Sequence, residues 1–230
     1  RQRQMCIRDR AIMQKITATR TQWHHIIITI CIGISTAFYI GKVPPALPYM
    51  REELEMSLVT AGWVVSIFNA LGTFIGIAVG SMADRLGAKR VISISLIILP
   101  LGSLIGYFSG DAEILLCSRL LEGVGYASIF VSGPALIARV VANEHRAAAV
   151  SLWSSTTPIG MTLAVVLAPI FIGSFGWRSL WIGTALFSLF IFSVFQIFMM
   201  SETMPRQKKL ETSLHHIKLT VTKSGPWLLA

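Results

Sequence analysis

Charged residues are scarce in this sequence. They make up 13% of its 230 residues, against about 25% in typical soluble domains, while hydrophobic residues make up 53%. A soluble domain of this length needs more polar surface than that to cover its core. The deficit indicates that lipid is the solvent for much of the chain.

The charges that are present are mostly positive, and the formal net charge is +9. In a soluble protein such a charge would suggest nucleic-acid binding. Here the lysines and arginines lie between apolar runs and form no stripe along one polar face, so we expect no nucleic-acid partner.

Recognisable patterns for metal binding and catalysis are missing as well. The three cysteines include no CxxC pair, and the adjacent histidine pairs at 24–25 and 215–216 lack the i, i+4 spacing of a helical zinc site. No set of serine, histidine and acid has supporting context, and no glycine-rich phosphate loop is present. We therefore predict no metal, no cofactor and no enzymatic activity, and we exclude an ATP-driven pump within this segment.

Six apolar runs are long enough to cross a bilayer, which takes about 20 residues. They cover residues 26–46, 58–83, 91–110, 114–138, 147–176 and 179–200. Short polar loops join them and leave too little polar surface for the buried helices of a soluble protein. We therefore predict an all-α membrane domain with six spans.

The distribution of cations predicts the orientation of these spans. With the first ten residues left out, twelve loop cations fall on the side of the N-terminus and three on the opposite side. The first set is Lys15, Arg20, Arg85, Lys89, Arg90, Arg139, Arg146, Arg206, Lys208, Lys209, Lys218 and Lys223, and the second is Lys42, Arg51 and Arg178. Both ends are therefore expected in the cytoplasm, with the spans in a bacterial inner membrane.

The remaining segments predict the domain organisation. Residues 1–22 form an N-terminal cytoplasmic segment, whose first ten residues resemble translated adapter sequence and are excluded from fold reasoning. Residues 23–200 form the six-helix transmembrane domain, residues 201–224 a basic cytoplasmic linker, and residues 225–230 the start of a truncated seventh helix. This is the layout expected of a transporter with two halves.

The loop after the second run carries the most specific motif, Gly80-Ser-Met-Ala-Asp84-Arg85-Leu-Gly87-Ala-Lys89-Arg90. This loop must turn tightly between two antiparallel helices, and Gly87 supplies the backbone freedom. The carboxylate of Asp84 can accept hydrogen bonds from backbone N–H groups or pair with an arginine. The cations Arg85, Lys89 and Arg90 hold the loop on the cytoplasmic side.

This motif resembles the signature loop of the major facilitator superfamily, with Ala88 where a basic residue is common. The resemblance covers nearly all of residues 24–200. It implies the major facilitator fold, in which this chain is an N-terminal six-helix bundle built as a 3+3 inverted repeat and needs a C-terminal six-helix half. It also implies that Asp84 is a gating residue, with Arg139 as its expected partner.

The fourth run places two charges inside the membrane, in Arg119-Leu-Leu-Glu122-Gly123-Val-Gly125, which is similar to the family pattern R-x-x-x-G-x-G. Arg119 lies roughly 9 Å below the outer end of the run. A charge near mid-membrane costs roughly 2.5–3.5 kcal/mol on insertion scales, so it faces a water-filled cavity or a partner. Arg119 and Glu122 share one helix face. Either they pair and fix helix packing, or Arg119 contacts an anion, Glu122 couples transport to protons, or both.

Two further polar residues are candidates for contact with substrate. Lys42 lies at the mouth of the first run, where Pro44 and Pro45 are expected to end or unwind the helix. It either snorkels to the outer interface or adds a second positive group to the outer cavity. Asn69 is a polar residue within the second run.

Glycines and prolines predict how the helices pack and bend. Gly72, Gly76 and Gly80 recur at four-residue spacing and predict close helix packing on one face of the second span. Gly123 and Gly125 give the fourth span a similar face. Pro158 and Pro169 predict a bent fifth span.

Together these features predict a secondary transporter that moves a small-molecule substrate across a lipid bilayer by alternating access. Arg119 and Lys42 favour a small anion or organic acid, as in the cyanate- and nitrate-permease-like members, and Glu122 favours proton coupling. Ala168 stands where drug-exporting members carry a glycine before the proline of the fifth span. A multidrug or metabolite efflux antiporter, a non-transporting membrane sensor or scaffold and, least favoured, a membrane enzyme are the alternatives.

Overall fold

The computed structural model describes residues 21–199, except for the side chains of residues 69, 71–75, 77, 78, 81 and 84. The predicted linker at 201–224 and the predicted start of a seventh helix at 225–230 lie outside the described residues. The elements, in chain order, are α2 (Trp23–Gly41), α3 (Val43–Glu53), α4 (Leu58–Leu86), α5 (Ala88–Tyr107), α6 (Ala112–Val140), the 3-10 turn η1 (Asn143–His145), α7 (Arg146–Ser154), α8 (Thr156–Phe175) and α9 (Arg178–Met199).

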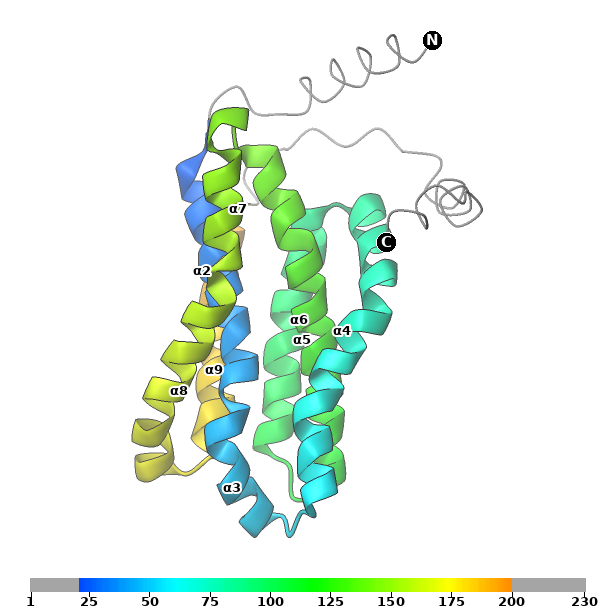
Figure 1. The fold of residues 1–230 in the computed structure, drawn as a ribbon, viewed down its shortest axis with the longest axis vertical. Helices are drawn as coiled ribbons and strands as arrows, with labels where there is room; N and C mark the ends of the chain where they lie inside the picture. The colour runs from blue at the N-terminus through cyan, green and yellow to red at the C-terminus, as the bar shows by residue number, and fades with distance from the viewer. Residues whose placement is uncertain (1–20, 200–230) are drawn as a thin grey trace, which may run out of the picture.

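These helices, joined by short turns, form an all-α membrane fold (Figure 1). Within residues 21–199, five segments are long and apolar enough to cross a membrane, namely Trp23–Glu53, Ala88–Tyr107, Ala112–Val140, Asn143–Phe175 and Arg178–Met199. The sixth long helix, α4, has 29 residues, and its stretch Leu58–Phe68 is apolar. The predicted fold class is confirmed.

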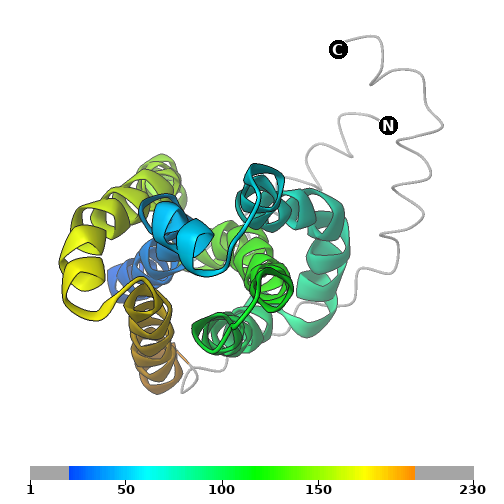
Figure 2. The same cartoon turned by 90° about the horizontal axis from the view of Figure 1, so that it is seen from below.

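The helices lie lengthwise beside one another in two groups, as Figure 1 and Figure 2 show. On one side α6 packs against α4 and α5, and on the other side α2 packs against α8. The groups are joined because α6 also contacts α2, while α9 contacts both α5 and α2. Polar side chains of α2, α5, α6 and α9 can therefore meet in the interior of the bundle.

The first span continues past its prolines, so its predicted end near residue 46 is wrong. After α2, Lys42 keeps a helical backbone (φ −70°, ψ −25°), and the chain continues as α3 to Glu53. Pro44 and Pro45 lie in the first turn of α3, where the missing N–H of proline costs no helical hydrogen bond. Lys42 thus lies within the span, with about 16 Å of helix beyond it, and does not belong to the outer loop.

The fifth span is interrupted one turn before Pro158. α7 ends at Ser154, and α8 begins at Thr156. A proline ring clashes with the carbonyl group one turn earlier in a helix, which accounts for the break at this position. α8 passes through Pro169 without interruption.

The close helix packing that the sequence predicts at the glycines of α4 is found instead between α2 and α8. A Cβ built on Gly76 or Gly80 of α4 would meet no atom within 4 Å, so the predicted close packing at these two positions is wrong for the part of the chain that the structure describes. The contact between α2 and α8 uses glycine instead. A Cβ on Gly160 would lie 2.5 Å from the carbonyl oxygen of Ile34 and 2.6 Å from the Cβ of Ala37.

Gly87 forms the turn between α4 and α5, as the sequence predicts. Its φ of +86° lies in the left-handed region that residues with a Cβ rarely adopt. Its N–H group donates to the carbonyl oxygen of Ala83 at 2.9 Å, which closes the end of α4.

The substitution Gly87→Ala is expected to destabilise the protein by about 1–2 kcal/mol, because a Cβ is strained at this φ. Thermal unfolding of the purified protein in detergent measures the effect. The matched control is Gly110→Ala, because a Cβ on Gly110 meets open space and Gly110 has no positive φ. Equal melting temperatures for the two variants would contradict the prediction.

Arg178, the first residue of α9, ties together the ends of three spans at the side predicted to be the outer one. Its guanidinium pairs with Glu53 at the end of α3. It also donates to the carbonyl oxygens of Tyr107 at 3.2 Å and Ser109 at 2.8 Å, at the end of α5. The indole N–H of Trp177 donates to Glu53 at 2.5 Å. The carbonyl contacts are partly buried and the ion pair is exposed, so the carbonyl contacts stabilise the fold more.

Arg178→Gln is therefore expected to cost roughly 1–2 kcal/mol of stability, through the lost hydrogen bonds to two carbonyl groups. Glu53→Gln removes the exposed ion pair but keeps an amide oxygen that can accept from the indole N–H of Trp177, so it is expected to cost less than about 1 kcal/mol. Melting temperatures of the two variants, compared at low and high salt, test this order. A larger loss for Glu53→Gln would show that the ion pair dominates.

Candidate functional site

Three charged side chains meet in the interior of the bundle. They are Lys42, between α2 and α3, and Arg119 and Glu122 of α6, and 2% or less of each side chain is exposed. Glu122 lies ten residues into α6, about 15 Å from the end of the helix that begins at Ala112. Helices of this chain alone enclose the cluster, which we call the charged cluster.

Glu122 is the centre of the charged cluster. Its Oε1 accepts a hydrogen bond from the Nζ of Lys42 at 2.7 Å and another from the hydroxyl of Ser103 at 2.6 Å. Its Oε2 pairs with the guanidinium of Arg119. Both carboxylate oxygens are therefore occupied, and Arg119 and Glu122 pair across one helical turn as their spacing allows.

The guanidinium of Arg119 is held by three helices. Its Nη1 also donates to the carbonyl oxygen of Tyr39 in α2 at 3.0 Å, and its Nε donates to that of Val64 in α4 at 3.4 Å. Its Cζ lies 4.3 Å from the ring centre of Phe68, a cation–π distance. An anion that contacts Arg119 would have to replace one of these partners.

Lys42 does not snorkel to the membrane surface. Its side chain is 1% exposed, and its Nζ donates to Glu122, to the hydroxyl of Ser103 at 2.7 Å and to the hydroxyl of Thr184 at 3.2 Å. An ammonium group has three donors, and here each finds an acceptor. The sequence alternative that sends Lys42 to the interface is wrong, because the span continues beyond this residue.

Two aromatic rings complete the surroundings of Lys42. Its Nζ lies 4.6 Å from the ring centre of Tyr39 and 4.5 Å from that of Trp181 in α9. The hydroxyl of Tyr39 donates to the carbonyl oxygen of Thr184 at 3.2 Å, which fixes α2 against α9. Both rings favour a positive charge on the amine.

Two glycines of α5 allow α6 and α9 to approach this closely. A Cβ on Gly102 would lie 2.8 Å from the Cγ of Glu122, and a Cβ on Gly106 would overlap the indole ring of Trp181. This G-x-x-x-G spacing brings two helices into contact and presents Ser103, between the glycines, to Glu122.

Sequence reasoning missed three residues of this site: Ser103, Thr184 and Trp181. The G-x-x-x-G spacing around Ser103 is a signal that could have indicated a helix contact in the third span. Thr184 and Trp181 lie in an uncharged span and carry no comparable signal.

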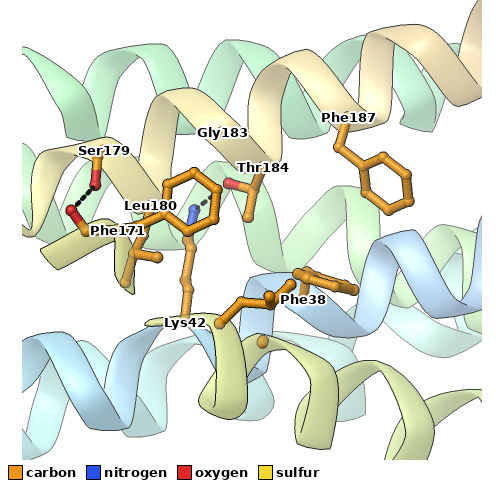
Figure 3. A pocket seen from close by; sticks show the side chains of 10 residues that line it. Phe38, Lys42, Phe171, Ser179, Leu180, Gly183, Thr184 and Phe187 are labelled. Carbon is orange, nitrogen blue, oxygen red and sulfur yellow. Dashed lines mark hydrogen bonds between the residues drawn. The ribbon is translucent and has the colours of Figure 1, made fainter. Parts of the chain in front are cut away.

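A cavity of about 300 Å³ lies beside Lys42, between α2, α8 and α9 (Figure 3). Its walls are largely apolar and include the rings of Phe38, Phe171 and Phe187. In Figure 3 the side chain of Lys42 extends across to Thr184, which also lines the cavity. The charged cluster therefore borders open space on the side of α9.

A family model described as Major Facilitator Superfamily matches residues 26–229. The chain belongs to this superfamily. Superfamily relatives include the riboflavin transporter RibZ of Clostridioides difficile, 23% identical over 68% of this chain and 35% of the relative. A probable 4-methylmuconolactone transporter of Cupriavidus pinatubonensis is 31% identical over 64% and 35%, and the galactose–proton symporter of Escherichia coli is 28% identical over 64% and 32%. The chain thus spans about a third of the length of these relatives.

The family match and the long apolar helices indicate that this major facilitator protein is a multi-pass membrane protein. The predicted membership in the major facilitator superfamily is therefore confirmed.

The signature loop of this superfamily member is described only in part. The amine of Lys89 donates to the carbonyl oxygen of Met199 at the end of α9, so the loop is tied to the C-terminal end of the sixth span. Arg139 lies in the last turn of α6. The side chain of Asp84 lies outside the described residues, and its pairing with Arg139 stays a prediction.

The remaining predicted positions lie on α4 and α6. Arg85 and Arg90 of the loop are exposed, in keeping with a position at the membrane surface. A Cβ on Gly125 would lie 2.8 Å from the Cγ of Leu99, so this glycine permits close contact with α5, and Gly123 is buried nearby. Asn69, like Gly72, is among the residues whose side chains are not described.

Proposed function

We propose that the whole protein is a secondary transporter that moves a small anion or organic acid across the bacterial cytoplasmic membrane, coupled to protons, by alternating access. In this proposal the chain is the N-terminal six-helix half with both ends in the cytoplasm, and a C-terminal half supplies the other wall of the central cavity. Within the superfamily we assign it to the cyanate- and nitrate-permease-like type.

The observation that carries the proposal is the charge of the cluster. Lys42 and Arg119 share one carboxylate, Glu122, and no other charged side chain is buried with them among the described residues. When all three are ionised the cluster carries one uncompensated positive charge. Burial of such a charge costs several kcal/mol, so a negative ligand is attracted to this part of the bundle.

In this mechanism Arg119 exchanges Glu122 for the substrate anion. The exchange would loosen the contacts of Arg119 with α2 and α4, which links substrate binding to helix packing. Asn69 would add a polar group to the cavity wall. The names of two relatives are in keeping with this reading, since one is a proton symporter and another a probable muconolactone transporter.

The signature loop would act as the gate of the same cycle. We assign Asp84 the role of pairing with Arg139 in one state. The loop glycines Gly80 and Gly87 shape the turn, and the loop cations Arg85, Lys89 and Arg90 anchor it at the membrane surface.

Transport by the full-length protein in liposomes tests the proposal. An imposed proton gradient is expected to drive uptake of labelled nitrate or benzoate, and the uptake is expected to disappear with a protonophore. Arg119→Ala should abolish it, whereas Arg51→Ala, a substitution of an exposed cation outside the charged cluster, should not. The lipophilic cation tetraphenylphosphonium is tested as a competitor of this anion uptake and as a transported probe.

The alternatives give different results in the same assay. Proton-driven export of tetraphenylphosphonium without sensitivity to anions would replace the anion proposal with multidrug efflux. Absence of flux for every probe, with intact folded protein in the liposomes, would favour a sensor or scaffold.

A further inference from the structure

The composition of the charged cluster restricts which of its groups can exchange a proton. The titratable groups that face Lys42 are Glu122 and Arg119 from α6 and Tyr39 from its own helix, while the groups that face it from α5 and α9 are uncharged. The side chains of α8 beside it in the cavity wall, such as Ala164 and Leu167, are apolar. The ionised cluster has a net charge of +1.

Only one proton transfer makes this cluster neutral while its ion pair survives. A guanidinium does not deprotonate in proteins, so Arg119 stays charged. Protonation of Glu122 would raise the net charge from +1 to +2 and remove the counter-charge of both cations. Loss of a proton from Lys42 leaves the pair of Arg119 and Glu122 intact, with a net charge of zero.

The hydrogen-bond partners of Lys42 suit both forms of its amine. As an ammonium group it donates to Glu122 and to the hydroxyls of Ser103 and Thr184. As a neutral amine it still has two donors and gains one acceptor site. The hydroxyl of Thr184, which now donates to the carbonyl oxygen of Trp181 at 3.0 Å, can turn and donate to the amine.

Opposing interactions act on the charge of Lys42. The carboxylate of Glu122, 2.7 Å away, and the rings of Tyr39 and Trp181 favour the ammonium form. Burial of a net charge in the bundle and the nearby guanidinium of Arg119 favour the neutral form. A group poised in this way changes its protonation state in response to a nearby charge.

We infer that Lys42 is the proton-exchanging group of the charged cluster and that Glu122 stays ionised throughout as its counter-charge. This inference deepens the proposed proton coupling and rests on it for its role in transport. The proton leaves the Nζ of Lys42 for a water molecule that reaches Thr184 from the bordering cavity, which gives a neutral amine and a hydronium ion. No other bond forms or breaks.

The same charge count couples the proton to an anion. With Lys42 neutral the empty cluster has no net charge. An anion at Arg119 adds one negative charge, which the return of a proton to Lys42 cancels. Anion and proton therefore favour each other's binding, and the thermodynamic linkage is that of a symporter with one proton for each monovalent anion.

The dependence of stability on pH tests the role of Lys42 without any transport assay. If folded Lys42 loses its proton where an unfolded lysine still holds one, the unfolded state binds more protons and stability rises with pH. The melting temperature of the full-length wild type is therefore expected to rise, relative to Lys42→Met, from acidic to alkaline pH. Lys42→Arg, which keeps the charge, should show no such rise relative to Lys42→Met. The control Lys89→Met replaces a lysine outside the charged cluster and should therefore keep the rise seen in the wild type.

The inference would be overturned if the difference in melting temperature between wild type and Lys42→Met did not change with pH. It would also be overturned by an infrared carbonyl band of a protonated carboxyl group that appears on acidification and is lost in Glu122→Gln. Sodium nitrate is expected to shift the rise in stability toward higher pH. If nitrate has no effect while the rise is present, the anion proposal fails and the assignment of Lys42 stands.

Discussion

Glu122→Gln is expected to destabilise the folded protein by about 3–5 kcal/mol and to abolish transport. Removal of one partner from a buried ion pair leaves the other charge uncompensated, which is why the cost is large. Here the carboxylate serves two cations and accepts a hydrogen bond from Ser103. Lys42 can become neutral after the substitution, but Arg119 cannot, so at least one buried charge stays without a counter-charge.

The matched control is Glu113→Gln. Glu113 lies in the first turn of the same helix and is exposed, so its loss is expected to cost less than about 1 kcal/mol. Thermal unfolding and the yield of monodisperse protein in detergent measure both variants. Glu122→Asp keeps the charge and is expected to lie between the two. Equal stability of Glu122→Gln and Glu113→Gln would show that the cluster is not held by its carboxylate.

Gly106→Ala is expected to lower stability by about 1–3 kcal/mol, the usual cost of overpacking a tight contact. The new methyl group would overlap the indole ring of Trp181 and come within 2.7 Å of the hydroxyl of Ser118. Trp181 must then move from its present place, 4.5 Å from the Nζ of Lys42, and its displacement is expected to weaken the cation–π contact. The same variant should therefore show a change in tryptophan fluorescence. Because the neutral amine is favoured, the rise of its melting temperature should also occur at lower pH than in the wild type.

Gly183→Ala provides the control for this substitution. Gly183 lies on the same helix as Trp181, and a Cβ there meets no atom within 4 Å. It is expected to change stability by less than about 1 kcal/mol, in the direction set by helix propensity. Identical behaviour of the two alanine variants would mean that α5 and α9 are not in close contact at Gly106.

The parts of this structure that could be predicted from the sequence are local. The turn at Gly87 depends on one backbone angle and its neighbours. The pairing of Arg119 with Glu122 depends on a spacing of three residues in one helix. Apolar runs of sufficient length indicate spans because a bilayer leaves helices few other choices.

The rest of the site depends on contacts between distant segments. The partners of Lys42 lie 61, 80 and 142 residues away in the sequence. Their hydroxyl groups have no charge or pattern that distinguishes them from other serines and threonines in membrane helices. Only the packing of α5, α6 and α9 around α2 selects them.

The misplaced end of the first span has a specific physical cause. Prolines stop a helix when they fall in its interior, but they also suit the first turn of a new helix. Pro44 and Pro45 lie two and three residues after Lys42 and occupy that first turn in α3. A sequence cannot show whether a new helix continues in the same direction, so it leaves the lysine either at the membrane surface or in the outer cavity.

The separation of Lys42 from its counter-charge has a consequence for biosynthesis. The ribosome makes Lys42 80 residues before Glu122, so the first span reaches the membrane while its partner does not yet exist. An unpaired lysine near the centre of a span costs roughly 2.5–3.5 kcal/mol on insertion scales. The first span is therefore expected to stay beside the insertion machinery until the fourth span emerges, so that these helices enter the lipid together rather than one by one.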